Sequence, residues 1–349
     1  MATPAIRVVH YGLGAIGGAI ARLTAGQRGL ALVGAVEVDP AKVGRDAGEV
    51  IGLGHAIGAP VTADAGALLR RTRPDIVIHA TTPWFHQAYP QLLECVEAGA
   101  NVISTCEELV YPFAKEPAAS AELHRVAAER GVTVVGAGVN PGFVMDLLPL
   151  MLTAPCVEVR RVAVRRTIDA TGRREQVLQR IGAGLSLGQF REHAERGGVR
   201  HVGLAESIGL IAEGLGWQLY RVTEQIDPIV ASEWLTTPFG TIAPGQVAGV
   251  RQNARGWMHG RDVISLTWEQ AVGSYKTLDA IHIDATPPLD LVIQGGLQGD
   301  QAAAALILHA IPRVLAAAPG LATVLSLPPN HYQPRPEPAP LAYARGASR

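Results

Sequence analysis

The stretch that decides the fold is Ile6-Arg7-Val8-Val9-His10-Tyr11-Gly12-Leu13-Gly14-Ala15-Ile16-Gly17. Its first six residues predict a strand, and the segment from Ala15 to Leu23 is a good helix former. Between them stands the spacing Gly12-x-Gly14-x-x-Gly17. The first glycine permits a tight turn, the second lets a ligand approach the backbone, and the third allows helix and strand to pack closely. Free amides at the start of the helix then form a site for phosphate groups.

Glu37 supports this interpretation. It follows Gly17 by twenty residues, at the end of the second expected strand, where a carboxylate can accept both ribose hydroxyl protons of a dinucleotide. The alternative is a glycine-rich structural turn followed by an ordinary surface acid. A carboxylate should repel a 2′-phosphate, which favours NAD, although Lys42 and Arg45 nearby leave NADP open. The candidate cofactor-binding residues here are Gly12, Leu13, Gly14, Ala15, Ile16, Gly17 and Glu37.

Composition narrows the classes of protein to which the chain can belong. Its 349 residues are 48% hydrophobic and 17% charged, enough apolar material for two packed domains. A net charge of −1 gives no basic surface for nucleic acid or an anionic membrane. Three cysteines fit neither a disulfide framework nor a zinc site, and neither a signal peptide nor a membrane span is visible. We therefore expect a cytoplasmic protein that binds a small molecule and no metal.

Short apolar runs alternate with helix-length segments up to residue 143, a pattern typical of a parallel sheet covered on both faces. Six strands are expected, at residues 6–11, 30–38, 59–62, 75–80, 101–104 and 133–137. The predicted fold class is α/β, with an N-terminal Rossmann-type, doubly wound parallel sheet over residues 1–143. Ligands of such sheets bind beyond the carboxyl ends of the strands, where the strand order reverses.

The pattern changes after residue 144. Strands at 157–168 and 280–285, with a Gly-rich helical stretch between them, predict an α+β domain over residues 144–300. The composition of residues 301–318 predicts a C-terminal helix that returns to the first domain, within a segment that spans 301–327. Six prolines between residues 328 and 340 oppose any helix or central strand, so residues 328–349 are expected to form a surface arm or to be disordered.

Two further turns at the carboxyl ends of expected strands carry polar side chains. Thr81 and Thr82 follow the fourth strand, where a cofactor would cross the sheet, but the same residues suit a capped turn into the next helix. The sixth strand is followed by a turn rich in Gly and Pro around Asn140, where the backbone can approach a flat ring. Asn140 could donate a hydrogen bond to a nicotinamide carboxamide, and a purely conformational role for this turn is the alternative.

The turn after the fifth strand, Ser104-Thr105-Cys106-Glu107-Glu108, is the leading candidate for chemistry. A carboxylate beside a nicotinamide can accept a proton from an ammonium group as hydride leaves the carbon, and burial would raise its pKa toward the working range. The alternative is a capping box, with Thr105 paired to Glu108 or Ser104 paired to Glu107. Either register frees the other glutamate, so spacing leaves the catalytic residue open between Glu107 and Glu108.

At these residues the chain resembles the 2,4-diaminopentanoate dehydrogenases and the related native amine dehydrogenases, within the dihydrodipicolinate-reductase-like superfamily. The resemblance extends from the first domain to the last helix. It rests on Ser-Thr-Cys-Glu-Glu at 104–108, Gly-Val-Asn-Pro-Gly-Phe-Val-Met-Asp at 138–146, His-Val-Gly-Leu-Ala-Glu-Ser at 201–207 and Ala-Ile-Pro-Arg at 310–313. The His-His-x-x-Lys stretch of true dihydrodipicolinate reductases has no counterpart here, which argues against that substrate.

The resemblance implies an NAD(P)-dependent oxidoreductase acting on CH–NH2 groups. Such an enzyme deaminates a small amine oxidatively and, in reverse, aminates a ketone or aldehyde with ammonia. The resemblance also implies a homodimer, with residues 144–300 serving substrate binding and dimerisation, and a glutamate in the site. In homoserine dehydrogenase, from the same superfamily, a catalytic lysine follows the corresponding strand at about the place of Glu107, which favours Glu107 over Glu108.

Other candidates and functions stay open at this point. Thr167 and His201 are candidates for substrate contact, although a structural hydrogen bond suits His201 equally. The arginine pairs 160–161 and 165–166 occupy both faces of a strand and are expected at solvent or an interface. The competing functions are a reductase of carbonyls to alcohols and a dinucleotide-binding sensor without turnover. Dependence of ketone reduction on ammonia separates the first from an amine dehydrogenase, and tight NADH binding without activity would support the second.

Overall fold

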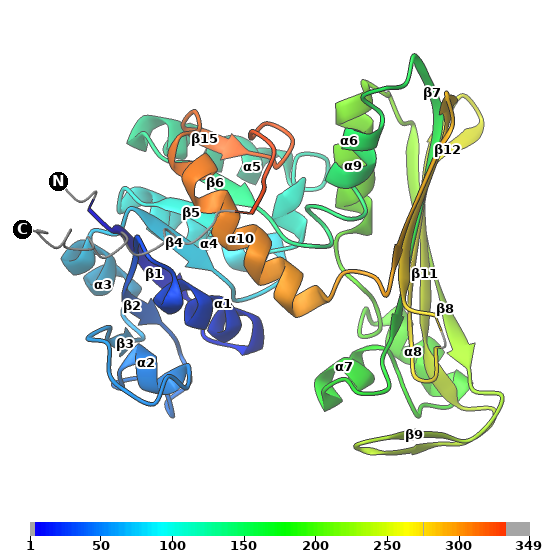
Figure 1. The fold of residues 1–349 in the computed structure, drawn as a ribbon, viewed down its shortest axis with the longest axis horizontal. Helices are drawn as coiled ribbons and strands as arrows, with labels where there is room; N and C mark the ends of the chain where they lie inside the picture. The colour runs from blue at the N-terminus through cyan, green and yellow to red at the C-terminus, as the bar shows by residue number, and fades with distance from the viewer. Residues whose placement is uncertain (1–3, 275, 333–349) are drawn as a thin grey trace, which may run out of the picture.

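The first domain is built on a seven-stranded parallel sheet with strand order β15-β6-β5-β4-β1-β2-β3 (Figure 1). The structure is a computed structural model that describes residues 4–274 and 276–332. The elements of this domain are β1 (Ile6–Tyr11), α1 (Ala15–Gly26), β2 (Leu30–Val36), α2 (Ala47–Val50), β3 (Val61–Thr62), α3 (Ala65–Thr72), β4 (Ile76–His79), α4 (Phe85–Glu97), β5 (Asn101–Ser104), the 3-10 helix η1 (Glu108–Val110), α5 (Pro117–Arg130), β6 (Thr133–Gly136) and, from the end of the chain, β15 (Gly320–Ala322).

Helices cover both faces of this sheet because its strands are apolar on both faces. Val8 and Ile103 pack on one face against α1 and α10 (Gly299–Leu315). Val9 and Val102 pack on the other face against α3, α4 and α5. The strand order reverses at β1, which pairs with β2 on one side and with β4 on the other. Turns that follow β1, β4, β5 and β6 therefore meet at one edge of the sheet.

The second domain is a six-stranded sheet with order β14-β13-β7-β12-β11-β8. Only the central pair of β7 and β12 is parallel within it. Figure 1 shows α6, α7 and α9 between this sheet and the first domain. The elements are α6 (Leu147–Leu152), β7 (Glu158–Asp169), α7 (Glu175–Arg180), α8 (Leu187–Glu195), α9 (Leu204–Leu215), β8 (Arg221–Val230), β9 (Leu235–Thr237), β10 (Gly240–Ile242), β11 (Val247–Met258), β12 (Arg261–Ala271), β13 (Leu278–Thr286) and β14 (Leu289–Gln294).

The structure corrects several details of the expected fold. A seventh strand, β15, joins β6 from within the 301–327 segment, where only a helix was expected. The helix itself ends at Leu315, and Gly320 adopts a φ of 132°, which helical residues do not adopt. A strand of three residues shows no periodicity, so the sequence could not reveal it. Of the Pro-rich tail, residues 333–349 lie outside the described residues, and Asn330 donates a hydrogen bond to Leu306 of α10.

Arg166 is a second correction, because it was expected at solvent or an interface and is instead 3% exposed. Both carboxylate oxygens of Asp279 on β13 lie 2.8 Å from its Nη1 atom. On β7, Arg166 follows the buried Val162 and Val164 at every second position, and side chains two residues apart in a strand point to the same face. Arg166 therefore lies on the face of the sheet that carries the hydrophobic core. No helix in the described part of the chain is both long and apolar enough to cross a membrane.

Candidate active site

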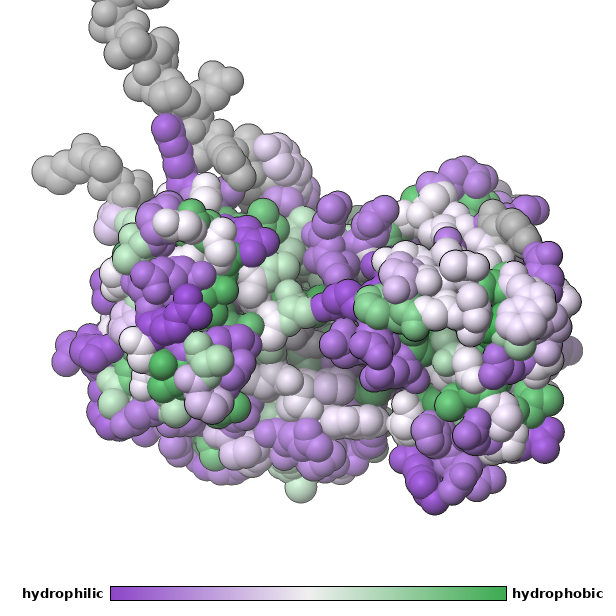
Figure 2. Space-filling view, turned by 90° about the horizontal axis from the view of Figure 1, so that it is seen from below, coloured by the Kyte–Doolittle hydropathy of each residue, from purple (hydrophilic) through white to green (hydrophobic). Residues whose placement is uncertain are grey.

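A cleft of about 560 Å³ lies between the two domains, at the carboxyl ends of the parallel strands. Figure 2 shows a recess between the two lobes with hydrophilic residues along it, viewed from the side on which α7 lies. Both domains contribute to its lining. From the first domain come Gly14, Ala15, Ile16, Gly17, Ala80, Thr81, Thr82, Pro83, Thr105, Glu107, Val110, Ala137, Gly138, Val139, Asn140 and Pro141, and from the second come residues that include Arg166, Arg173, Arg174, Val177, Arg180, Arg200, His201, Trp268 and Gln270.

The glycine turn has the geometry that a diphosphate requires. A Cβ atom at Gly12, whose φ is 94°, would lie 2.4 Å from the carbonyl oxygen of Ala80, and one at Gly17 would lie 2.1 Å from that of Gly12. Beside Gly14, by contrast, a Cβ would meet nothing within 4 Å, so the space on the cleft side is open. Gly14 is the N-cap of α1 and provides no side-chain acceptor, which leaves amides of the first turn for an anion.

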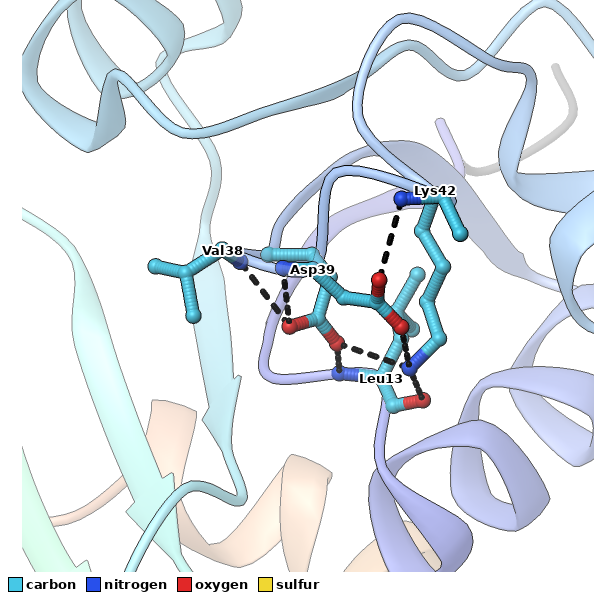
Figure 3. A network of polar contacts seen from close by, with 6 residues as sticks. Leu13, Val38, Asp39 and Lys42 are labelled. Carbon is cyan, nitrogen blue, oxygen red and sulfur yellow. Dashed lines mark hydrogen bonds and ion pairs between the residues drawn. The ribbon is translucent and has the colours of Figure 1, made fainter.

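Glu37 lies beside this turn in a network of polar contacts (Figure 3). Its Oε2 atom accepts the amide of Leu13 at 2.9 Å, and its Oε1 atom accepts the amides of Val38 at 2.9 Å and Asp39 at 3.2 Å. Lys42 is 3.4 Å from the same carboxylate. Burial alone would raise the pKa of Glu37, but these hydrogen bonds and Lys42 lower it. Glu37 is therefore an anion at neutral pH. Neither it nor Gly12 nor Leu13 lines the cleft itself.

Thr81 and Thr82 line the cleft and also hold the turn that leads into α4. The Thr81 hydroxyl donates to Gln91 at 2.7 Å, and the Thr82 hydroxyl donates to Gln87 at 2.7 Å. Thr82 also accepts the amide of Trp84. Both interpretations of these residues, cofactor contact and a capped turn, are thus compatible with their positions.

Glu107 and Glu108 are adjacent in sequence but differ sharply in environment. Glu108 is 2% exposed, accepts the amide of Phe85 at 2.8 Å and forms an ion pair with Lys115. Phe85 is the first residue of α4, so the carboxylate sits at the positive end of that helix. Neither expected capping box forms, because η1 has no side-chain cap. Glu108 instead ties its turn to a helix that precedes it by more than twenty residues.

Glu107 faces the cleft, and within the described chain its carboxylate has neither a hydrogen bond nor a salt bridge to another residue. Burial raises its pKa to about 8, the neighbouring carboxylates of Glu206 and Glu108 add to the rise, and Arg180 opposes it. A carboxyl group with such a pKa can both donate and accept a proton near neutral pH.

Glu206, in the first turn of α9, is a site residue that the sequence analysis did not identify. It is 7% exposed, and burial raises its pKa to about 7, with Glu108 and Glu224 adding to the rise and Lys115 opposing it. The helix begins against the turn that holds Glu107, since a Cβ at Gly203 would lie 2.6 Å from Pro141 and 3.4 Å from the Cβ of Glu107. Gly203, with a φ of 104°, permits this approach.

Asn140 and His201 form one unit at the bottom of the cleft. Nδ2 of Asn140 lies 2.8 Å from Nε2 of His201, whose ring stacks on Trp268 with the centroids 4.9 Å apart. Burial and the nearby Arg180 and Arg166 lower the pKa of His201 to about 3, so the ring is neutral and is no proton donor at physiological pH. The Oδ1 atom of Asn140 is buried and has no partner among the described residues. An acceptor is therefore available there, and the expected donation by Asn140 stays a prediction.

Thr167 does not line the cleft itself. It lines an adjoining cavity of about 370 Å³ that shares Arg166, Ile168, Gly172 and Arg173 with the cleft, and its hydroxyl is 3.5 Å from Glu269. Its contact with substrate stays a prediction. The arginines of the cleft are the main group that sequence reasoning missed. For Arg166 a signal existed in the sequence, because it shares one strand face with Val162 and Val164. A charged residue on such an apolar face is unusual and marks the position as a special one. For Arg174 and Arg180 the sequence held no such signal.

Comparison with known proteins agrees with the resemblance expected from the motifs. Residues 143–333 match the family model of the 2,4-diaminopentanoate dehydrogenase C-terminal domain, and residues 6–106 match that of the dihydrodipicolinate reductase N-terminus. A 2,4-diaminopentanoate dehydrogenase of Acetoanaerobium sticklandii is 31% identical over 93% of this chain and 93% of its own length. An amine dehydrogenase of Streptomyces virginiae is 23% identical over 93% of this chain and 96% of its own length.

A solved structure extends this likeness to three dimensions. The amine dehydrogenase from Mycobacterium smegmatis superimposes with a TM-score of 0.83 and 27% sequence identity, covering 95% of this chain and 98% of that one. A dihydrodipicolinate reductase from Paenisporosarcina superimposes with a TM-score of 0.53 at 13% identity, which is a likeness of fold alone.

The environment of Glu108 predicts a structural role that a stability measurement can test. Glu108→Ala should lower the free energy of unfolding by about 1–3 kcal/mol, because the Phe85 amide and Lys115 lose a buried acceptor. The free energy of unfolding of Glu107→Gln, one residue away, should stay close to that of the wild type, because the Glu107 carboxylate forms no hydrogen bond or salt bridge with another described residue. Urea denaturation of both variants measures the difference, and an unchanged midpoint for Glu108→Ala would contradict this assignment.

Proposed function

Because the chain belongs to the 2,4-diaminopentanoate dehydrogenase family, we propose that it is an NAD(P)-dependent amine dehydrogenase in which Glu107 moves the proton. The observation that carries this proposal is the Glu107 carboxyl at the cleft, half-buried without a salt bridge and with a pKa raised to about 8. The relatives named above act on amines, and a carboxyl group with this pKa can accept a proton from an ammonium once it is ionised.

A nicotinamide dinucleotide fits two places in the cleft and one beside it. In the cleft, the open space beside Gly14 would accept a diphosphate, and the unpartnered Oδ1 atom of Asn140 would accept the amide group of a carboxamide. Beside the glycine turn, Glu37 would accept ribose hydroxyls. When bound, the cofactor accepts or supplies a hydride. Asn140 then fixes the ring at the bottom of the cleft, on the same sheet edge as Glu107.

In the oxidative direction the Glu107 carboxylate takes a proton from the substrate ammonium, so that the nitrogen lone pair can form the C=N bond as hydride leaves the same carbon. The resulting imine gains water and loses ammonia, and the protonated Glu107 can return its proton in that stage. The reverse sequence aminates a carbonyl. His201 is neutral and serves to position Asn140 rather than to exchange protons.

The cofactor preference that we propose is NAD. Glu37 is anionic and forms an ion pair with Lys42, so the Lys42 ammonium is not free to bind a 2′-phosphate. We also propose a homodimer that forms through the second domain. Large apolar side chains are exposed near the hairpin of β9 and β10, where Trp234 is 69% and Phe239 is 55% exposed. A cytoplasmic location stays a prediction.

Glu107→Gln tests the proposed chemistry directly. The variant should lose about 100-fold or more of the ammonium-dependent turnover, because an amide cannot accept the proton. The measurement is NADH oxidation with a panel of small ketones and aldehydes, with and without ammonium, while fluorescence titration follows NADH binding. Binding should persist. Ketone reduction that proceeds equally without ammonium would identify a carbonyl reductase instead, and full activity of the variant would remove Glu107 from the mechanism.

The pH dependence of amine oxidation should follow the ionisation of Glu107, which the neighbouring Glu206 influences. Only the carboxylate form of Glu107 accepts a proton, so kcat/KM should rise with pH through an apparent pKa near 8. Glu206→Gln removes a neighbouring negative charge and should move this midpoint to lower pH. Glu195→Gln, on the exposed surface of α8, is the matched control and should leave the profile in place. A Glu206→Gln profile identical to the wild type would argue against the coupling.

The cofactor preference is tested by Glu37→Ser. NADH should bind about 10-fold more weakly, because the ribose hydroxyls lose a charged acceptor. NADPH should bind more tightly, because Lys42 becomes available to the 2′-phosphate. Glu129→Ser, an exposed acid paired with Arg125 on α5, is the control. Dissociation constants from fluorescence titration measure both effects, and an unchanged NADH-to-NADPH ratio would contradict the role of Glu37.

A further inference from the structure

The charges of the cleft are divided between the two domains. Among its lining residues, the first domain contributes Glu107, and α10, which packs on that domain, contributes Asp300, so the charges on this side are acidic. Five arginines come from the second domain, namely Arg166, Arg173, Arg174, Arg180 and Arg200. The diphosphate of a dinucleotide would therefore lie on a surface that provides amides but no cation, with the cations on the opposite side of the cleft.

Two of these arginines are paired with acidic residues of the second domain. Arg166 is paired with Asp279 through two contacts of 2.8 Å, and Arg200 is 2.7 Å from Glu224. Arg180 acts electrostatically on Glu107 and His201, which places it at the chemical end of the cleft. Arg173 raises the positive potential beside Arg166. Arg174 differs from the other four because it pairs with a residue of α10, through a contact weak enough to be exchanged.

Arg174 pairs with Asp300 across 3.6 Å, which is too long for a good hydrogen bond, and the two side chains are 47% and 51% exposed. Asp300 lies in the first turn of α10, and α10 packs on the same sheet face as α1. Gly14 to Gly17, Asp300 and Arg174 line the same cleft. The pair thus lies in the cleft that the glycine turn also lines, and its acid is on a helix that packs against α1.

We propose that Arg174 exchanges Asp300 for the diphosphate of the bound cofactor and so binds the cofactor from the second domain. This inference rests on the proposed use of a dinucleotide and adds a residue outside the Rossmann domain to its site. A guanidinium forms bidentate, charge-assisted hydrogen bonds with phosphate oxygens, whereas its present partner is solvated and distant. The cofactor would thereby connect the two domains around the substrate.

Binding without turnover tests the proposal. Arg174→Gln should weaken NADH binding about 10-fold in fluorescence titration, and should weaken ADP, used as a competitor, by a similar factor because ADP carries the diphosphate without the nicotinamide. Asp300→Asn should bind both compounds as tightly as the wild type or more tightly, because it removes the competing carboxylate. Arg196→Gln removes an equal charge from the exposed surface of α8 and should change neither affinity.

The outcomes separate this inference from the proposed chemistry. Wild-type affinity of Arg174→Gln for NADH and ADP would overturn the inference even if amine oxidation is confirmed. A higher KM for the ketone with unchanged NADH affinity would also overturn it, because Arg174 would then serve the substrate. Loss of NADH affinity without loss of ADP affinity would place Arg174 at the nicotinamide end and would equally reject it. Each result stands whether or not Glu107 is the acid–base group.

Discussion

The constraint on which the site depends is the partial burial of one carboxyl group, that of Glu107, without a cation bonded to it. A carboxylate taken out of water is costly unless it is paired, so it tends to keep its proton. The fold tolerates this because the contacts that hold the turn in place are formed by Glu108, the next residue. It anchors the turn to the start of α4 through Phe85 and to Lys115. Glu107 is thereby free to face the cleft.

Both domains are needed to create this environment. The parallel sheet brings the turns after β4, β5 and β6 to one edge, which places Thr81, Glu107 and Asn140 around the same cleft. The second domain then closes the site, because α9 begins against Glu107 at Gly203 and brings Glu206 beside it. The negative neighbour raises the proton affinity of Glu107, whereas the arginines of the second domain keep the cleft attractive to anions. The first domain thus holds the carboxyl group and the amides of the glycine turn, and the second domain supplies the cations of the cleft.

The sequence predicted the features that local physics controls. The strand, glycine turn and helix around Gly12 to Gly17 depend on neighbouring residues, so spacing revealed them, and five of the six Rossmann strands overlap closely with those observed. The choice between Glu107 and Glu108 depends on Phe85 and Lys115, which come from other segments, so spacing left it open. Only the packing of the second domain brings Glu206 beside Glu107 and Arg174 into the cleft. For the same reason, the sequence analysis placed Arg166 at solvent or an interface, whereas it is buried and paired with Asp279.

The central claim is that Glu107 lies against the reactive face of a bound nicotinamide with space for one carbon–nitrogen group between them. A crystal structure with NAD and a non-reactive amine tests it most directly. The account predicts the Glu107 carboxyl within hydrogen-bonding distance of the amine nitrogen, and the carboxamide on Oδ1 of Asn140. A structure in which Glu107 turns away from the cofactor, with no carboxyl group in its place, would contradict the account.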